Sequence, residues 1–229
     1  NLTGLAVARH VMLDDKLDDA VVYCSDQSHA SLQKALRLLG FSSEQVRVIP
    51  TDTDYRLQPK QLEGVLIKDR ELGRRPFCII ASAGTTNTGA VDPLPEIADL
   101  CAAYNLWFHV DGAYGAAAAL SSQGKTELSG LNQANSIAVD PHKWLFQPFE
   151  CGCILLRDRA LLPRTFAAHH DYMQDGAPAD VNLCDYGIQL TRGFRALKLW
   201  LSLKIFGLGA FRAAIDHGLA MGKFTETLL

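Results

Sequence analysis

The sequence predicts an α/β fold, a three-layer sandwich in which a mostly parallel sheet lies between two layers of helices. Short apolar runs alternate with amphipathic segments of helical length, which is typical of strand–helix–strand units. The run 77–82 is apolar throughout, as expected for a parallel strand that helices cover on both faces. Hydrophobic residues make up 48% of the 229 residues, enough for a sizeable core.

Six strands and six helices are expected along the chain. The predicted strands are 21–25, 46–50, 77–82, 106–111, 136–139 and 152–157. The predicted helices are 2–17, 29–39, 59–73, 92–104, 194–206 and 209–229. Pro59 stands at or near the first position of its helix, and Gly40 ends the preceding helix. We expect irregular structure or short helix around 114–130, and a long loop over 161–179 because no periodicity is visible there.

Bulk properties limit the classes of function. The chain has 22 basic and 25 acidic residues, a net charge of −3 and no long run of either sign. Nothing therefore favours a nucleic acid or an acidic membrane surface as a partner. No apolar run reaches the roughly 18 residues of a spanning helix. The six cysteines lack CxxC or Cys/His spacing, which favours reduced thiols in a cytoplasmic protein over a metal site.

Two predicted strands end in residues that can do chemistry. One strand ends at Asp111 and is followed by small residues. The other is followed by Asp-Pro-His-Lys-Trp at 140–144, where Pro141 cannot continue a sheet ladder. Ligands of open α/β sheets bind outside the carboxyl ends of the strands. We therefore expect Asp111 and Lys143 at one functional edge of the sheet.

An aspartate and a lysine in such places are the two groups that pyridoxal phosphate (PLP) needs. A lysine beside aromatic surface loses its proton more readily, and a neutral amine forms a Schiff base with an aldehyde. A buried carboxylate is costly unless paired, and a pyridinium N–H would pair it. The alternatives are a surface Lys143 whose stem lies on Trp144, and an Asp111 that caps the following turn.

Five motifs, in their order along the chain, resemble the PLP-dependent group II decarboxylases, and the nearest branch is the aromatic-L-amino-acid decarboxylases. The motifs are Ser25-Asp26-Gln27-Ser28-His29, Ala83-Gly84-Thr85-Thr86, His109-Val110-Asp111-Gly112-Ala113-Tyr114, Asp140-Pro141-His142-Lys143-Trp144 and Arg192-Gly193-Phe194-Arg195. Each motif alone is moderately specific, whereas the ordered set is highly specific and covers nearly the whole chain. The resemblance implies the large domain of fold type I PLP-dependent transferase-like enzymes, with a mostly parallel seven-stranded sheet.

The resemblance also implies catalytic roles. Lys143 would hold the cofactor aldehyde, Asp111 would keep the pyridine nitrogen protonated, and His29 would stack on the ring. The alternative for His29 is a histidine with local hydrogen bonds only. Tyr172 corresponds to the tyrosine of the family's catalytic loop and would donate a proton to the substrate; otherwise it is a surface tyrosine. The pair at 169–170 departs from the family's loop and receives no role, because adjacent histidines without a third ligand are a weak metal site.

Four further residues are expected to contact or line the cofactor site. Thr86 and Ala113 would lie against the cofactor, the alternatives being an ordinary hydroxyl-rich turn and plain packing. Asp140 would lie near the phosphate or near Lys143, although many relatives have asparagine there. His142 would line the site.

The resemblance implies a domain division and a partner. Residues 1–190 would form the PLP-binding large domain, and 191–229 would be helices that lead toward a C-terminal small domain. The family has a Ser/Gly-rich phosphate loop before the position of Asn1 and its small domain after Leu229. We therefore expect this chain to be a fragment that lacks both. Relatives are homodimers, and the same state is expected here.

The function that the resemblance implies is decarboxylation of an L-amino acid to its amine and CO2. Trp144, next to the lysine, favours the aromatic branch and thus an aromatic substrate. Diaminobutyrate, glutamate or a sulfinate amino acid remains as an alternative substrate. A related aldehyde synthase is a second alternative, against which Tyr172 argues because such enzymes favour phenylalanine there. A third is a truncated fragment without activity, or a binding module.

Overall fold

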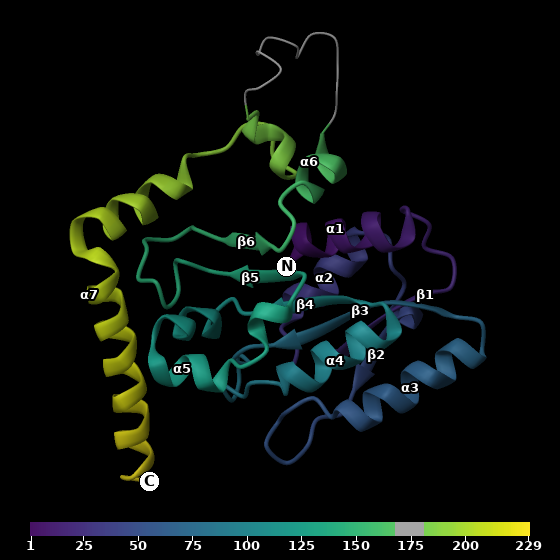
Figure 1. Cartoon of the computed structure of the whole chain (residues 1–229), viewed down its shortest axis with the longest axis horizontal. Helices are drawn as coiled ribbons and strands as arrows, with labels where there is room; N and C mark the ends of the chain where they lie inside the picture. Colours follow the sequence, from purple (N-terminus) through teal and green to yellow (C-terminus); the bar gives the residue numbers. More distant parts are fainter. Residues whose placement is uncertain (168–180) are drawn as a thin grey trace.

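The computed structural model describes residues 1–167 and 181–229 and contains one six-stranded sheet (Figure 1). The strand order is β2-β1-β3-β4-β5-β6. The strands are β1 (Ala20–Ser25), β2 (Val46–Ile49), β3 (Arg75–Ser82), β4 (Trp107–Asp111), β5 (Ser136–Val139) and β6 (Cys153–Leu156). Strands β1 to β5 are parallel, and β6 pairs antiparallel with β5. The mostly parallel sheet is confirmed, with six strands in the described residues where the resemblance implied seven.

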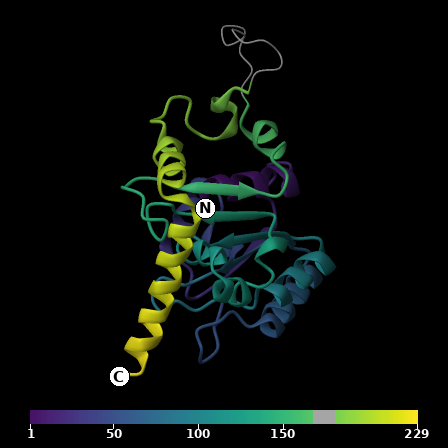
Figure 2. The ribbon, with the colours of Figure 1, turned by 60° about the vertical axis from the view of Figure 1, so that its left-hand side comes forward.

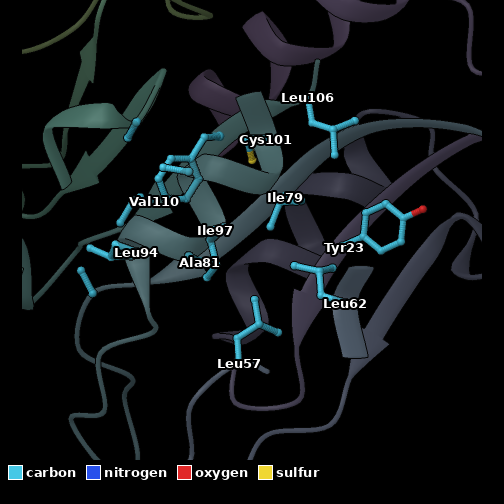
Figure 3. Packing of buried hydrophobic residues seen from close by; sticks show 14 of the residues in the cluster. Tyr23, Leu57, Leu62, Ile79, Ala81, Leu94, Ile97, Cys101, Leu106 and Val110 are labelled. Carbon is cyan, nitrogen blue, oxygen red and sulfur yellow. The ribbon is translucent and has the colours of Figure 1, made fainter. Parts of the chain in front are cut away.

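Helices cover both faces of the sheet, so the three-layer sandwich is confirmed. One face packs against α1 (Leu2–Leu13) and α2 (Ala30–Leu38), and the other against α3 (Pro59–Glu71) and α4 (Leu94–Tyr104). Figure 3 shows the second core, in which Tyr23 and Ile79 of the sheet meet Leu62 of α3 and Ile97 of α4. Burying such side chains is the main favourable term in folding.

Strand β4 belongs to both cores, because its side chains alternate between the two faces of the sheet. Trp107 packs in the core beneath α1 and α2, whereas Phe108 and Val110 pack in the core beneath α3 and α4. His109 and Asp111 share the face of Trp107. This strand therefore places two titratable side chains on the α1 face, and the second of them stands where the strand ends.

Two predicted segments differ clearly from the structure in their bounds. The first helix ends at Leu13, because Asp14 and Asp15 take positive φ angles of 51° and 58°. The loop predicted over 161–179 was wrong at its start, where α6 (Leu161–Phe166) is helical. Periodicity missed this helix because it has only six residues, fewer than two turns. Part of that predicted loop lies outside the described residues.

The C-terminal segment is helical, as predicted. Helix α7 (Arg195–Glu226) is interrupted at Gly207, whose φ of 73° and ψ of 159° are not helical, so two stretches result. Figures 1 and 2 both show α7 as a long element along one side of the sheet. It is attached by hydrogen bonds from Ser202 Oγ to Gln147 Oε1, 3.0 Å, and from Arg212 Nε to Leu120 O, 2.9 Å.

The remaining elements are short. They are α5 (Ser122–Glu127) and the 3-10 helices Ser43–Gln45, Gly115–Leu120, Leu131–Gln133 and Leu183–Tyr186. Two of these fall where irregular structure or short helix was expected. Within the two described ranges, no helix is both long enough and apolar enough to cross a membrane.

A buried carboxylate ties the β2 edge of the sheet to α3. Asp69 accepts a hydrogen bond from the Tyr23 hydroxyl at 2.9 Å and three from the Arg47 guanidinium, at 2.7 and 3.2 Å to Oδ1 and 3.0 Å to Oδ2. Burial, together with the adjacent Asp69, raises the pKa of Tyr23 far above its ordinary value. A bidentate guanidinium and a phenol hydroxyl satisfy the carboxylate in a core that excludes water.

Replacing Asp69 by alanine is expected to lower the free energy of unfolding by about 2–3 kcal/mol, because the partners lose their acceptor. Because Arg47 remains partly exposed, the loss of unfolding free energy is smaller than for a fully buried ion pair. Glu71→Ala, at the exposed end of the same helix, is the control and should change stability by less than about 0.5 kcal/mol. Urea unfolding followed by circular dichroism measures both. Equal effects of the two substitutions would contradict the assignment of Asp69 as a structural centre.

Candidate active site

A cavity of about 330 Å³ lies at the carboxyl ends of the parallel strands. The predicted residues that line it are His29, Thr86, Asp111, Ala113, Asp140 and Lys143. They come from the segments that follow β1, β3, β4 and β5, four strands whose carboxyl ends share one edge of the sheet. The edge expected from the sequence therefore exists and is hollow.

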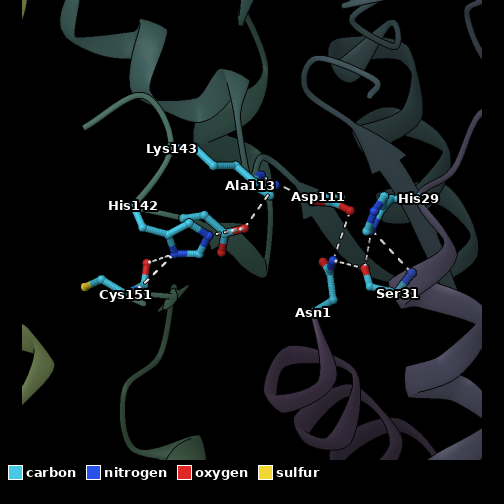
Figure 4. Close-up of polar contacts among 9 residues, drawn as sticks. Asn1, His29, Ser31, Asp111, Ala113, His142, Lys143 and Cys151 are labelled. Carbon is cyan, nitrogen blue, oxygen red and sulfur yellow. Dashed lines mark hydrogen bonds and ion pairs between the residues drawn. The ribbon is translucent and has the colours of Figure 1, made fainter. Parts of the chain in front are cut away.

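Asp111 ends β4 and is buried, with 8% of its surface exposed. Its Oδ1 accepts the Ala113 backbone N–H at 3.2 Å, and its Oδ2 accepts Asn1 Nδ2 at 2.9 Å (Figure 4). A carboxylate has about four acceptor positions, so these two bonds leave room for a further donor from the cavity. Asp111 can therefore cap the turn that follows β4 and still accept a hydrogen bond from a cofactor nitrogen.

Lys143 stands in a tight turn that follows β5. Its backbone N–H donates to Asp140 O at 2.8 Å, and its Nζ lies 3.1 Å from Asp140 Oδ2. The side chain is partly exposed and lines the cavity. Asp140 thus lies beside the lysine amine, one of the two places expected for it from the resemblance.

His29 is the N-cap residue of α2 and lines the same cavity. Its Nδ1 accepts the Ser31 backbone N–H at 3.3 Å and lies 2.9 Å from Ser31 Oγ. This arrangement ties one ring nitrogen to the helix terminus and leaves the other without a partner among the described residues. Local hydrogen bonding and cavity lining therefore coexist.

The segment 83–91 forms the part of the cavity after β3. An isolated bridge between Ala83 and Val91 closes it, and Gly84 has a φ of 89°. A Cβ on Gly115 would lie 2.2 Å from Ala83 O, so only glycine lets these two backbones meet. The close contact brings the Thr86 segment beside the segment that carries Ala113.

Asp92 braces this segment from behind. It is buried and accepts the backbone N–H groups of Leu57 at 2.7 Å and Ser82 at 2.6 Å. Burial raises the pKa of Asp92 to about 6, and the two N–H donors oppose that shift. A carboxylate that holds two backbone donors in the core is a structural clamp at the end of β3.

One predicted site residue of the described part of the chain, His142, is not brought into the cavity. Its Nδ1 lies 2.8 Å from Cys151 O and 3.0 Å from Cys151 N, and its ring packs edge-on against Phe149. Its Nε2 is 3.8 Å from Asp140 Oδ2, so His142 lies beside a carboxylate that does line the cavity. Tyr172, like the histidines at 169–170, lies outside the described residues.

Sequence reasoning missed several residues that line the cavity. Asn1 and Ser31 contact Asp111 and His29, and Tyr114 and Lys34 form part of the wall. Tyr114 directly follows Ala113 and could have been found by its position. Asn1 carries no signal in the sequence, because its place depends on the packing of α1. No group of three or more metal-binding side chains is assembled in the part of the chain that the structure describes.

Comparison with protein families gives a match over almost the whole chain. The model of the "Pyridoxal-dependent decarboxylase conserved domain" matches residues 7–229. This chain belongs to that family. The resemblance drawn from the five motifs is thereby confirmed, and so is the fold type, because solved structures that it matches, a tryptophan decarboxylase of Catharanthus roseus among them, have this architecture.

Curated relatives include enzymes with different substrates. The chain is 47% identical over 232 residues to an aromatic-L-amino-acid decarboxylase of Bacillus atrophaeus, a match that covers all of this chain and 48% of that enzyme. It is 41% identical to an L-2,4-diaminobutyrate decarboxylase of Rhizobium meliloti, covering 94% of this chain and 44% of that enzyme. The chain thus spans about half the length of these relatives.

A solved structure gives the same result for the fold. The crystal structure of Oryza sativa TDC with PLP and tryptamine superposes with a TM-score of 0.93 at 33% identity. The match covers 99% of this chain and 49% of that one. The family's architecture therefore extends over nearly every residue of this chain.

The turn that carries Lys143 is anchored by an aromatic stack, which makes a testable prediction. The rings of Tyr114 and Trp144 lie 4.8 Å apart and nearly parallel, at 12°. Tyr114→Ala, Trp144→Ala and the double variant should reveal a coupling free energy of about 0.5–1.5 kcal/mol in urea unfolding. Phe146→Ala is the matched control, because this nearby side chain is 55% exposed and should not couple to Tyr114. Additive effects at 114 and 144 would contradict the anchoring role.

Proposed function

We propose that the protein containing this chain is a PLP-dependent decarboxylase that converts an L-amino acid, with an aromatic side chain as first choice, to its amine and CO2. The observation that carries the proposal is the single cavity lined by both Lys143 and Asp111. These are the two functional groups that anchor PLP by its aldehyde and by its pyridine nitrogen. Membership of the pyridoxal-dependent family and the identity to the Bacillus atrophaeus enzyme support it.

The residues present fit the cofactor. Asp111 is buried and keeps acceptor positions free, so a protonated pyridine nitrogen would complete its hydrogen bonds. Ala113 and Gly84 leave the wall of the cavity open to a flat ring. The Lys143 amine lies in the cavity within 3.1 Å of a carboxylate.

When bound, PLP supplies a ring that accepts the electron pair left on Cα as the carboxylate departs. Asp111 would hold a proton at the pyridine nitrogen, because a buried anion favours a cationic partner. His29 would lie against the face of the ring, a contact that contributes about 0.5–1.5 kcal/mol beyond burial. Lys143 Nζ would hold the cofactor aldehyde and later release the amine product, with Asp140 orienting the amine.

The other predicted residues keep supporting roles in the proposal. Thr86 would place its hydroxyl beside the cofactor, and Ala113 would underlie the ring. His142 would act through Asp140, because its ring faces Cys151. Tyr172, outside the described residues, is proposed to deliver the proton to Cα of the product.

Residues 1–190 are proposed to be the PLP-binding large domain, and 191–229 to be helices that lead toward a further domain.

We also infer a homodimer, since large apolar side chains of α7 are exposed, among them Trp200, Ile205 and Phe206. A cytoplasmic location is supported by six cysteines that are all free thiols. Sedimentation equilibrium at micromolar concentration should give twice the mass of one chain, and a monomer there would contradict the dimer.

The cofactor assignment is tested by comparing two lysines of the same cavity. Lys143→Ala should abolish the cofactor absorbance band and the covalent label that borohydride leaves, because the chain then offers no amine at the aldehyde position. Lys34→Ala, at the wall of the cavity, should retain both. Difference spectra and mass mapping of the labelled peptide measure this. A label that persists in Lys143→Ala would exclude Lys143 as the anchoring residue.

The substrate is tested with the same preparations. Aromatic L-amino acids, L-2,4-diaminobutyrate, L-glutamate and a sulfinate amino acid would each be incubated with the enzyme, and amine and CO2 measured. Diaminobutyrate is the second candidate because of the 41% identity to the Rhizobium meliloti enzyme. Hydrogen peroxide and aldehyde among the products would favour the aldehyde synthase instead. If none of these amino acids reacts, an inactive fragment or a binding module is favoured.

A further inference from the structure

On the face of β4 that packs against α1, three side chains can form hydrogen bonds: Trp107, His109 and Asp111. The middle one is a histidine in the interior of the sheet. His109 has no exposed surface, and it pairs in register with Ser136 of β5. A buried imidazole must have both ring nitrogens bonded, and in the described residues no buried side-chain nitrogen or oxygen lacks a partner. The bonds of His109 therefore connect the interior of the sheet to the cavity.

The donor and the acceptor in each of these hydrogen bonds follow from the groups that can only donate or only accept. Asn1 Oδ1 only accepts, so His109 Nε2, 2.9 Å away, carries the proton. Burial lowers the pKa of His109 to about 3, so the ring is neutral and its Nδ1 accepts the Ser136 hydroxyl at 2.7 Å. Trp107 Nε1 only donates, and it bonds Ser136 Oγ at 2.8 Å. Because Ser136 Oγ accepts from Trp107, its own hydrogen is available to His109 Nδ1, in agreement with a proton on Nε2.

The Asp111 carboxylate, which only accepts, fixes the orientation of the Asn1 amide independently of the His109 tautomer. With its oxygen held by His109, its amino group donates to Asp111 Oδ2 at 2.9 Å and to Ser31 Oγ at 3.1 Å. A reversed amide would place its oxygen against the Asp111 carboxylate, with no proton between them. Since Ser31 Oγ accepts from Asn1, its own hydrogen points to His29 Nδ1 at 2.9 Å. The same chain therefore reaches both proposed cofactor contacts (Figure 4).

A glycine in α1 makes this approach possible. A Cβ on Gly4 would lie 3.0 Å from Cε1 of His109 and 2.9 Å from Cδ1 of Ile154. Helix α1 thus packs directly on the imidazole ring, and this packing holds Asn1 within reach of Nε2. This contact between α1 and the His109 ring does not involve the hydrogen bonds. It also indicates that His109 positions Asn1.

We propose that His109 is a positioning residue, which through the amide of Asn1 holds Asp111 in the orientation that the cofactor nitrogen requires and directs His29 Nδ1 toward Ser31. The effect on cofactor binding rests on the proposed function, whereas the tautomer and the amide orientation do not. Loss of the Nε2–H donor would remove one of the bonds that hold the Asn1 amide and would loosen the N–H that this amide donates to Asp111.

The tautomer is tested first, on the protein that carries this chain, without cofactor. Two-bond proton–nitrogen correlation spectra of histidine labelled with 15N distinguish the two neutral tautomers from the cation. The His109 resonances, assigned by their absence from His109→Gln, should show a neutral ring protonated at Nε2 at pH 7. A ring protonated at Nδ1, or a cation, would overturn the proposal whether or not the protein binds PLP.

The functional consequence is tested by affinity for PLP, measured by equilibrium dialysis. His109→Phe should weaken binding about tenfold, because a hydrogen bond that orients a charged group is lost. His109→Gln should restore most of that loss, since its amide N–H can reach Asn1. Gly4→Ala should weaken binding in the same direction, because its Cβ displaces the ring.

Trp107→Phe is the matched control. It removes a buried donor from the far end of the same chain of bonds, yet Ser136 can still donate to His109 Nδ1, so PLP affinity should hold. If His109 had a merely structural role, Trp107→Phe would lower the affinity for PLP as much as His109→Phe does, or His109→Gln would bind PLP no better than His109→Phe. Either result overturns the proposal. If the unmodified protein binds no PLP, the proposed function fails and the tautomer measurement still decides this inference.

Discussion

The structure depends on keeping an anion, Asp111, buried at the end of a central strand. An isolated carboxylate in a low-dielectric interior is strongly unfavourable, so every neighbour of Asp111 has to supply a donor or leave room for one. The Ala113 N–H comes from the turn after β4, and the Asn1 amide comes from the start of α1. These two donors join a turn and a distant helix at one point. The remaining acceptor capacity opens into the cavity.

Much of the fold was predictable because it depends on local patterns. Apolar runs, Pro59 at its helix start and the glycine at 40 identify strands and helices by periodicity and backbone conformation alone. The end of α1 at Leu13 was not predictable, since it depends on aspartates in the left-handed region that form no standard stop signal. Helix α6 was missed because six residues are too few to show a period.

The candidate site was predictable to the extent that its residues end strands. Asp111 and Lys143 follow apolar runs, so their shared edge follows from parallel topology. The contacts between segments were not predictable: Asn1 reaches Asp111 across 110 positions, and His109 reads in sequence as one more strand residue. His142 illustrates the reverse, because proximity to Lys143 in sequence suggested a cavity position, whereas the turn directs its ring toward Cys151.

The long sequence separations in the site also bear on how the protein folds. Bonds between Asn1 and both His109 and Asp111 join positions about a hundred residues apart, and both of these partners of Asn1 lie on β4, between β3 and β5. Closing such loops has an entropic cost that local structure cannot offset, and parallel sheets of this kind fold slowly. Contacts this distant in sequence therefore add to the entropic cost of assembling the cavity. A ligand bound in the cavity would report that the strands around it have reached their native register.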